Sequence, residues 1–499
     1  MGRGPVAVTP NNLGVRLTRF QGWARGPGGG TLGDMMTTQV FSRLDSLLSS
    51  RCTVIQPGEP GWDAARMAWN VAVDQQPVAV VTVREVTDVA TVVRLAGEAG
   101  IPVAAQPGGH GATRALDGAV LVRTSALTEI TIDRVARTAR VGAGVKWGTL
   151  LPHLDGTGLI ALAGSSPDVS VVGYLLGGGM SWFSRKYGPA SRSVRAVELV
   201  TAAGEPTRVT EHSDPDLFWA LRGGGGDFGI VTAIEFDLYE EPALTGGKLM
   251  FPAEQAAAVL TAVARVQAGA PRELTLWAAV THFPPLPEVP QSLRGNSFAV
   301  VDVTFLGPVP ALADLLAPIR AAGTAVVDTV DVVPIGRLGE VAAEPVDPMP
   351  AMDLGVLLHR FDEDVIGRLL SVAGGRTPLT TVSVRHLAGA MAEPGRDGVA
   401  GHYEETHLLF AMGVPANHEL AAAIDVAFAE LRRALGDVAS ARVPFNFLGL
   451  QDIEEAYDDK ELARLRDIKR DRDPRGVIRS NHPVDAGTSA PGPDGRELS

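Results

Sequence analysis

Two glycine-rich stretches hold the residues whose types and spacing suit chemistry on a bound ligand. In the first, from Pro107 to Gly111, His110 lies between glycines, so few side chains pack around its ring. Such an imidazole is free to react with a ligand beside it, although a surface turn explains the same pattern. In the second, Gly177-Gly178-Gly179 follows an apolar run. Glycine N–H groups can hold a diphosphate, whereas the alternative is a tight turn between buried strands.

Bulk composition narrows the class of protein. A chain of 499 residues is long enough for about two to four domains. The net charge of −13 argues against a nucleic-acid partner. The single cysteine, Cys52, excludes an internal disulfide and a cysteine-rich metal site, and we expect no metal. We find no apolar window of membrane length and no secretory apolar core in residues 1–36, so we expect a cytoplasmic protein without a membrane partner.

The spacing of apolar residues and glycines divides the chain into two regions. Up to about residue 240, short β-branched runs alternate with short helical patterns and glycine turns, which is typical of α/β units. Beyond it the glycine runs vanish, and longer amphipathic helices alternate with apolar strands, which predicts an α+β domain. The expected helices cover residues 38–48, 63–71, 87–99, 147–154, 253–267, 310–322, 418–435 and 459–470, and the later strands cover 274–280, 298–305, 379–386 and 407–414.

Taken together, these motifs resemble the berberine-bridge-enzyme-like branch of the FAD-linked oxidases, within the vanillyl-alcohol-oxidase superfamily. The resemblance covers residues 65–240 and, more weakly, 440–484. The matching motifs are Trp69-Asn70, Gly108-Gly109-His110, residues 141–148, residues 173–179, Arg185-Lys186-Tyr187-Gly188, residues 216–226, residues 228–232 and Asn446-Phe447.

The resemblance implies an α+β fold. A two-subdomain α/β FAD-binding region of the PCMH type carries an inserted α+β substrate domain built on an antiparallel sheet. We expect a disordered leader at 1–36, the FAD-binding domain at 37–243 with its core at about 73–243, the substrate domain at 244–445, a segment at 446–484 that completes the FAD domain, and a disordered tail at 485–499.

FAD is the cofactor that the resemblance implies, attached through the 8α-methyl group of the flavin to a ring nitrogen of His110. Many relatives add a second bond from a cysteine at the position of Ser166, and Cys52 is too far upstream to replace it. We therefore expect one covalent attachment. The residues expected around FAD are Gly108, Gly109, His110, Gly111, Ser166, Pro167, Val172, Gly173, Tyr174, Gly177, Gly178, Gly179, Tyr187, Gly188, Gly229, Ile230, Val231, Asn446 and Phe447.

The chemistry implied is hydride transfer from a small-molecule substrate to flavin N5, helped by a base, with O2 as electron acceptor. Pro444 and Ser383 stand where relatives carry the usual bases. His386 is one remaining candidate, although a buried core histidine is the alternative; because it alternates with Arg385, only one of the two faces the flavin. Tyr403 and Glu404 are the others, in a polar cluster with Glu405 and His407 that an exposed loop also explains.

The sequence thus predicts an FAD-linked oxidase of a hydroxylated small molecule, such as a sugar or a glycosylated or polyketide natural product. The alternative is a flavoprotein of secondary metabolism that performs dehydrogenation or oxidative cyclisation without simple alcohol oxidation, which the residues at the two base positions favour. A binding-only protein is the third hypothesis. Substrate identity and oligomeric state stay open.

Overall fold

The structure is a computed structural model that describes residues 52–241, 243–285, 287, 289–395 and 398–485. The expected leader, the helix at 38–48 and all but the first residue of the tail lie outside these residues. None of the helices described is long and apolar enough to cross a membrane.

A first small sheet opens the part of the chain that the sequence predicts to bind FAD, called the FAD-binding part below. Its order is β1-β2-β4-β3, with β2, β4 and β3 parallel and β1 antiparallel at the edge. Helix α3 (Val86–Glu98) covers it and begins at a capping box in which the side chains of Glu85 and Asp88 bond each other's backbone N–H groups. The valine-rich parallel strands of the sheet are almost wholly buried, as expected of parallel strands. The strands are β1 (Thr53–Ile55), β2 (Ala79–Thr82), β3 (Val103–Ala105) and β4 (Val120–Arg123).

A second, antiparallel sheet of order β5-β6-β10-β8-β9 follows. One hydrophobic core joins it to the short helices around the glycine stretches, with Trp147, Trp182 and Phe236 fully buried. The elements are β5 (Ile130–Asp133), β6 (Thr138–Gly142), α4 (Trp147–Leu150), β7 (Leu159–Ile160), α5 (Val171–Leu176), α6 (Ser184–Tyr187), β8 (Val194–Val200), β9 (Pro206–Val209), α7 (Pro215–Ala220), β10 (Ile230–Asp237) and β11 (Tyr239–Glu240).

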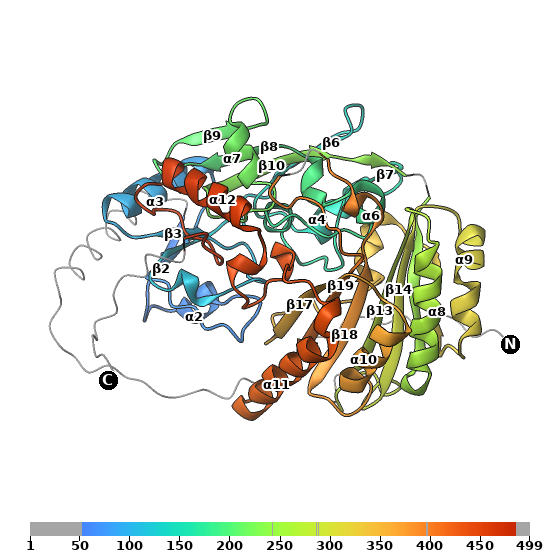
Figure 1. Cartoon of the computed structure of the whole chain (residues 1–499). Helices are drawn as coiled ribbons and strands as arrows, with labels where there is room; N and C mark the ends of the chain where they lie inside the picture. Colours follow the sequence, from blue (N-terminus) through green and yellow to red (C-terminus); the bar gives the residue numbers. More distant parts are fainter. Residues whose placement is uncertain (1–51, 242, 286, 288, 396–397, 486–499) are drawn as a thin grey trace.

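The inserted part is a large antiparallel sheet of order β15-β12-β14-β13-β18-β19-β17, with β16 also paired to β12. Figure 1 shows helices α8 to α11 alongside this sheet and the FAD-binding part beyond it. The strands are β12 (Thr245–Pro252), β13 (Leu274–His282), β14 (Ser297–Phe305), β15 (Val327–Asp328), β16 (Asp331–Val332), β17 (Met352–Leu358), β18 (Leu379–His386) and β19 (His407–Gly413), and the helices are α8 (Ala256–Ala268), α9 (Val309–Ala321), α10 (Glu363–Ala373) and α11 (His418–Leu435).

The two faces of the large sheet have different neighbours, which decides which side chains meet the FAD-binding part. The outer face packs its alternate apolar residues, such as Val382 and Val384, on α8 to α11. The inner face carries Trp277, whose ring stacks on Trp182 of the FAD-binding part with centroids 3.6 Å apart. Phe410 lies on the same face and contacts Phe447 edge-on. The inner face therefore looks toward the predicted cofactor site.

The end of the described chain returns to the FAD-binding part. Helix α12 (Asp459–Arg472) lies beside α7 (Figure 1), and Arg464 pairs with Asp216 at 2.7 Å. Beyond it, Ile478 pairs in parallel with Val103 at the open edge of the first sheet. The segment after the inserted sheet therefore packs against α7 and the edge of the first sheet.

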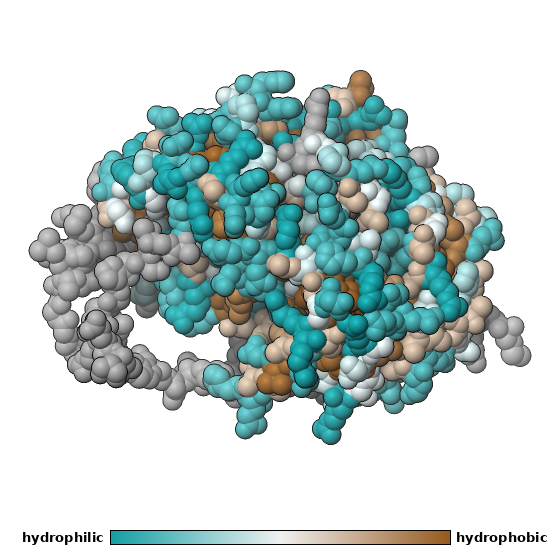
Figure 2. All heavy atoms as spheres, in the orientation of Figure 1, coloured by the Kyte–Doolittle hydropathy of each residue, from teal (hydrophilic) through white to brown (hydrophobic). Residues whose placement is uncertain are grey.

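Most predicted elements are confirmed, and two bounds, those of β18 and α11, match the predicted ones. The helix predicted over residues 63–71 is wrong. Helix α2 spans only Trp62–Arg66, because the N–H groups of Trp69 and Asn70 bond the carbonyls of Gly108 and Gly109 instead of continuing the helix. Figure 2 shows hydrophobic residues scattered among hydrophilic ones over the visible surface.

Candidate active site

The loop that carries His110 offers a row of free backbone donors. Among the described residues, the N–H groups of Gly108, Gly109, His110 and Gly111 donate no hydrogen bond. The carbonyls of Gly108 and Gly109 are used, since they accept from Trp69 and Asn70. A turn with its carbonyls bonded and its N–H groups free suits an anion. These residues therefore fit the diphosphate of FAD in a protein whose net charge is negative.

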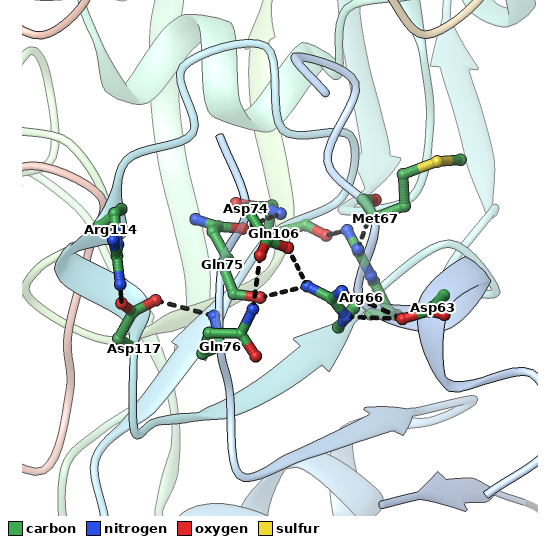
Figure 3. A network of polar contacts seen from close by, with 10 residues as sticks. Asp63, Arg66, Met67, Asp74, Gln75, Gln76, Gln106, Arg114 and Asp117 are labelled. Atoms are coloured by element: carbon green, nitrogen blue, oxygen red, sulfur yellow. Dashed lines mark hydrogen bonds and ion pairs between the residues drawn. The ribbon is translucent and has the colours of Figure 1, made fainter. Parts of the chain in front are cut away.

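A polar network holds this loop in place (Figure 3). Arg66 bonds the Gln75 carbonyl at 2.8 Å and pairs with Asp74. The side chain of Gln75 in turn accepts from Gln106, just before the loop, at 2.9 Å. From the end of the chain, Asn481 donates to Gln106 at 3.2 Å and accepts from the Gln75 side chain. The loop is thus fixed by residues from both ends of the described chain.

His110 is held between an aromatic ring and a carboxylate. Its ring stacks on Trp69 with centroids 4.2 Å apart, and its Nε2 atom lies 3.6 Å from Asp168 Oδ2. The other oxygen of Asp168 pairs with Lys146. Burial raises the pKa of Asp168, but the bond from Lys146 and the nearby His110 outweigh burial and hold that pKa below its usual value. Asp168 is therefore a carboxylate, and it leaves Nδ1 as the ring nitrogen facing away from it.

The glycine run at 177–179 has a different role from the one predicted. Its N–H groups are already used: Gly177 bonds Gly173 O, Gly178 bonds Leu175 O, and Gly179 bonds Asn446 Oδ1 at 2.8 Å. A Cβ on Gly177 would collide with the Asn446 side chain. The run is thus the end of α5 packed tightly on the Asn446 segment, and its N–H groups are not free to bind a diphosphate, whereas those of the His110 loop are.

Three of the predicted cofactor residues carry a buried polar atom without a partner among the described residues. The Ser166 hydroxyl, the Tyr174 hydroxyl and His110 Nε2 are buried and make no hydrogen bond in the part of the chain that the structure describes. Because a buried polar atom without a partner is costly, each calls for a ligand atom or a water molecule. His110 contacts Asp168, two residues beyond Ser166 in the chain, so the unpartnered atoms of His110 and Ser166 fit a polar cofactor such as FAD.

The remaining predicted cofactor residues lie in different elements and do not all face the same side. Val172 and Gly173 lie in the first turn of α5, and Pro167 packs against Gly148. Tyr187 donates to Glu241, and burial, followed by that carboxylate, raises its pKa, so its hydroxyl already has a partner. Gly188 follows at the end of α6, and Gly229, Ile230 and Val231 form the buried start of β10 and the turn before it. Only part of the predicted set therefore faces one common space.

A small pocket joins the glycine run to the inserted domain. Tyr403, which is buried, lines it together with Asn446 and Phe447 from the C-terminal segment. The other lining residues are Gly177, Gly178, Gly179, Met180, Pro189, Met391 and Pro444. Of the predicted catalytic residues, Tyr403 is thus the one that the structure brings beside the cofactor motifs. Glu404, its neighbour, is exposed.

His386 points away from this site. Its ring stacks on His407, whose Nε2 lies 3.2 Å from Gln267 of α8, so both histidines belong to the outer face of the large sheet. Burial, helped by Arg185 and His407, lowers the pKa of His386 to about 2. A histidine that holds its proton so weakly and faces the helices is unsuited to be the base, which argues against the prediction. Alternation along a strand placed Arg385 and His386 on opposite faces, but no pattern in the sequence told which face was which.

Two inner-face residues were not predicted as site residues. Arg385 is 8% exposed and lies over the ring of Trp277 at 4.2 Å. Asp353, on β17, is paired in register with Met412, and burial raises its pKa to about 6. Strand β17 was itself missed because its apolar run is short. Charged residues inside an apolar strand are the signal that would have found both.

The comparisons with known proteins agree with this geometry. Residues 77–210 match the sequence family described as FAD binding domain. Over 207 residues the chain is 36% identical to (R)-6-hydroxynicotine oxidase of Paenarthrobacter nicotinovorans, which covers 41% of this chain and 45% of that protein. The matched segments span 25% to 54% of the length of such curated relatives.

Solved structures extend the similarity to the whole fold. The berberine-bridge-like protein 1 of Physcomitrella patens superimposes with a TM-score of 0.77 at 19% identity, covering 89% of this chain and 99% of that one. Glucooligosaccharide oxidase of Acremonium strictum, described as carrying a 6-S-cysteinyl, 8α-N1-histidyl FAD, gives 0.73 at 21% identity, with coverages of 89% and 99%. The chain therefore carries an FAD-binding domain and has the α+β fold of the berberine-bridge-like FAD oxidases.

Proposed function

We propose that this protein is an FAD-dependent oxidase that takes hydride from a hydroxylated small molecule and passes the electrons to O2. Bound FAD supplies the redox chemistry, and the protein supplies position and polarity. The observation that carries the proposal is the His110 loop, with its free N–H groups and a histidine fixed between Trp69 and Asp168. We further propose that His110 holds the flavin covalently and alone, because Ser166 stands where a second attachment would come from.

The oxidase activity is tested on purified protein mixed anaerobically with a panel of sugars and hydroxylated aromatic and polyketide compounds. Bleaching of the yellow colour by at least one compound, followed by recovery and H2O2 release when air is admitted, is the expected result. Flavin that bleaches but does not recover in air would exclude O2 as acceptor. A bound flavin that no hydroxylated compound bleaches would count against alcohol oxidation.

Tyr403 is our candidate for the group that removes the substrate's hydroxyl proton, since it shares the pocket with Asn446 and the glycine run. We expect Tyr403→Phe to lower the rate of flavin reduction by about 100-fold or more, the usual contribution of a positioned base. Rapid-mixing absorbance measures that rate. Asp353→Asn is the comparison. If this change lowers the rate of flavin reduction more than Tyr403→Phe does, and the wild-type rate rises around pH 6, Asp353 would be the base instead.

Asp168 is expected to assist attachment of the flavin by holding His110 Nε2 and leaving Nδ1 free. We predict that Asp168→Asn slows covalent attachment about tenfold or more, because the amide is neutral and no longer orients the imidazole as a carboxylate does. The acid-stable fraction of flavin, followed over hours after FAD is added to apoprotein, reports this. Attachment at the wild-type rate would show that Asp168 serves only Lys146.

One observation favours the alternative function. Ser383, at a usual base position, has its hydroxyl bonded to the Phe410 carbonyl at 3.2 Å, and Pro444 has no side-chain proton acceptor. A site without these bases is better suited to oxidising an acidic or activated substrate, as in dehydrogenation or oxidative cyclisation. Reduction of the flavin by such compounds, but by no simple alcohol or sugar, would favour this function.

A further inference from the structure

The inner face of the large sheet holds a buried cation, Arg385, that forms no ion pair with the residues that the structure describes. Arg385 is 8% exposed, and its Nε atom is buried without a hydrogen bond. Within the described residues, its side chain makes no hydrogen bond or ion pair at all. Arg185, which is also buried, is fully bonded by comparison: it donates hydrogen bonds to the carbonyl oxygens of Leu387 and Pro271 at 2.9 and 2.7 Å.

The acidic residues nearest to Arg385 do not neutralise it. Asp302 is already paired with Lys248 at 2.5 Å. Glu344 acts on Arg385 only at a distance, since no ion pair joins them. Burial lowers the pKa of Arg385, and these two carboxylates only partly oppose that effect. A buried guanidinium left in this state is unfavourable unless an anion arrives to meet it.

The surroundings of Arg385 define the shape of such an anion. The guanidinium carbon lies 4.2 Å from the Trp277 ring centroid, 5.2 Å from that of Phe410 and 5.1 Å from that of Phe447. Phe447 also lines the pocket that contains Tyr403. Three aromatic rings around a planar donor make a flat, apolar setting in which a carboxylate can be bonded by two N–H groups at once.

We propose that Arg385 is the anion-binding group of the substrate site, and that the natural substrate is a small molecule with a planar, delocalised oxyanion, a carboxylate or an acidic phenol. The inference rests on the proposed function, because it names the substrate class of the same site. Within that site Arg385 anchors the acidic group and the aromatic rings enclose the body of the molecule. An anionic reduced flavin could also meet Arg385, and the test below distinguishes it from a substrate anion.

The test is calorimetric titration of the purified holoprotein with benzoate and with benzamide, its uncharged counterpart. We expect wild-type protein to bind benzoate at least tenfold more tightly than benzamide. Arg385→Met should weaken benzoate binding at least tenfold and leave benzamide unchanged, and Arg385→Lys should lie between. Arg320→Met is the matched control, since it removes an arginine of the inserted domain that pairs with Asp328 at the far edge of the sheet.

Equal binding of benzoate to wild type and Arg385→Met, or no preference over benzamide in wild type, would overturn the proposal. So would unchanged benzoate binding with a shifted flavin potential in Arg385→Met, which would assign the cation to the flavin. If the methionine variant does not fold, the wild-type preference and the lysine variant decide. Flavin content is measured on the same sample: colourless protein that binds benzoate contradicts the proposed function alone, whereas yellow protein indifferent to benzoate contradicts this inference alone.

Discussion

Replacing His110 by alanine is expected to abolish covalent flavin attachment completely. In wild-type protein precipitated with acid, we expect the yellow colour to stay with the pellet. In His110→Ala, all of the colour should move to the supernatant, because His110 is the one residue proposed to bond the 8α-methyl group and Ser166 replaces the cysteine of doubly attached relatives. The free N–H groups of Gly108 to Gly111 belong to the backbone, so the variant should still bind FAD without attaching it.

His153→Ala is the control for this experiment, since it removes an exposed histidine from the same part of the chain and should leave the pellet yellow. Flavin fluorescence of the denatured protein after gel electrophoresis gives an independent measurement. Colour that stays with the His110→Ala pellet would mean that another residue forms the bond.

Lys469→Met is expected to destabilise the fold more than any surface change. Lys469 is 7% exposed and bonds Asp473 at 2.9 Å and the carbonyls of Asp227 and Ile478, each at 2.7 Å. Removing the cation leaves Asp227 and Asp473 buried without it, a change that costs about 3–5 kcal/mol in free energy of unfolding. Urea unfolding followed by tryptophan fluorescence measures the loss.

The same change should reduce flavin attachment. The Asp227 carboxylate bonds the N–H groups of Ser480 and Val484, so it fixes the segment from which Asn481 supports the His110 loop. Arg470→Met, one position along, removes an exposed arginine paired with Asp467 and should change stability by about 1 kcal/mol or less. Equal effects of the two substitutions would show that the buried pairs do not hold the segment.

Local patterns predicted most elements because they depend on neighbouring residues. Asn417 caps α11, and Gly436 follows its last residue, so both bounds of the helix were readable from the chain. The His110 loop was readable for a similar reason, since a glycine-flanked histidine is a local pattern. The family resemblance then predicted the fold. The solved structures support it, and so does the match of 134 residues to the FAD-binding domain family.

What the sequence left open depends on contacts between distant residues. Nothing local shows that the N–H of Gly179 donates to the Asn446 side chain. Because of this bond, the run at 177–179 packs against Asn446 and does not offer the diphosphate-binding donors that were expected. Nothing local shows that Val382 and Val384 face the helices, an arrangement that puts His386 on the outer face of the sheet and Arg385 on the inner face. Asp168 lies before the glycine run at 177–179 in the sequence, but its contacts with Lys146 and His110 depend on the fold.

The measurement that tests the central claim most directly is peptide mass mapping of the purified wild-type protein, with its visible spectrum recorded first. We predict a flavin spectrum and one peptide, the one that contains His110, whose mass is increased by a single FAD, with the peptide that contains Ser166 unmodified. A protein without flavin, or with its flavin attached at any other residue, would contradict the account.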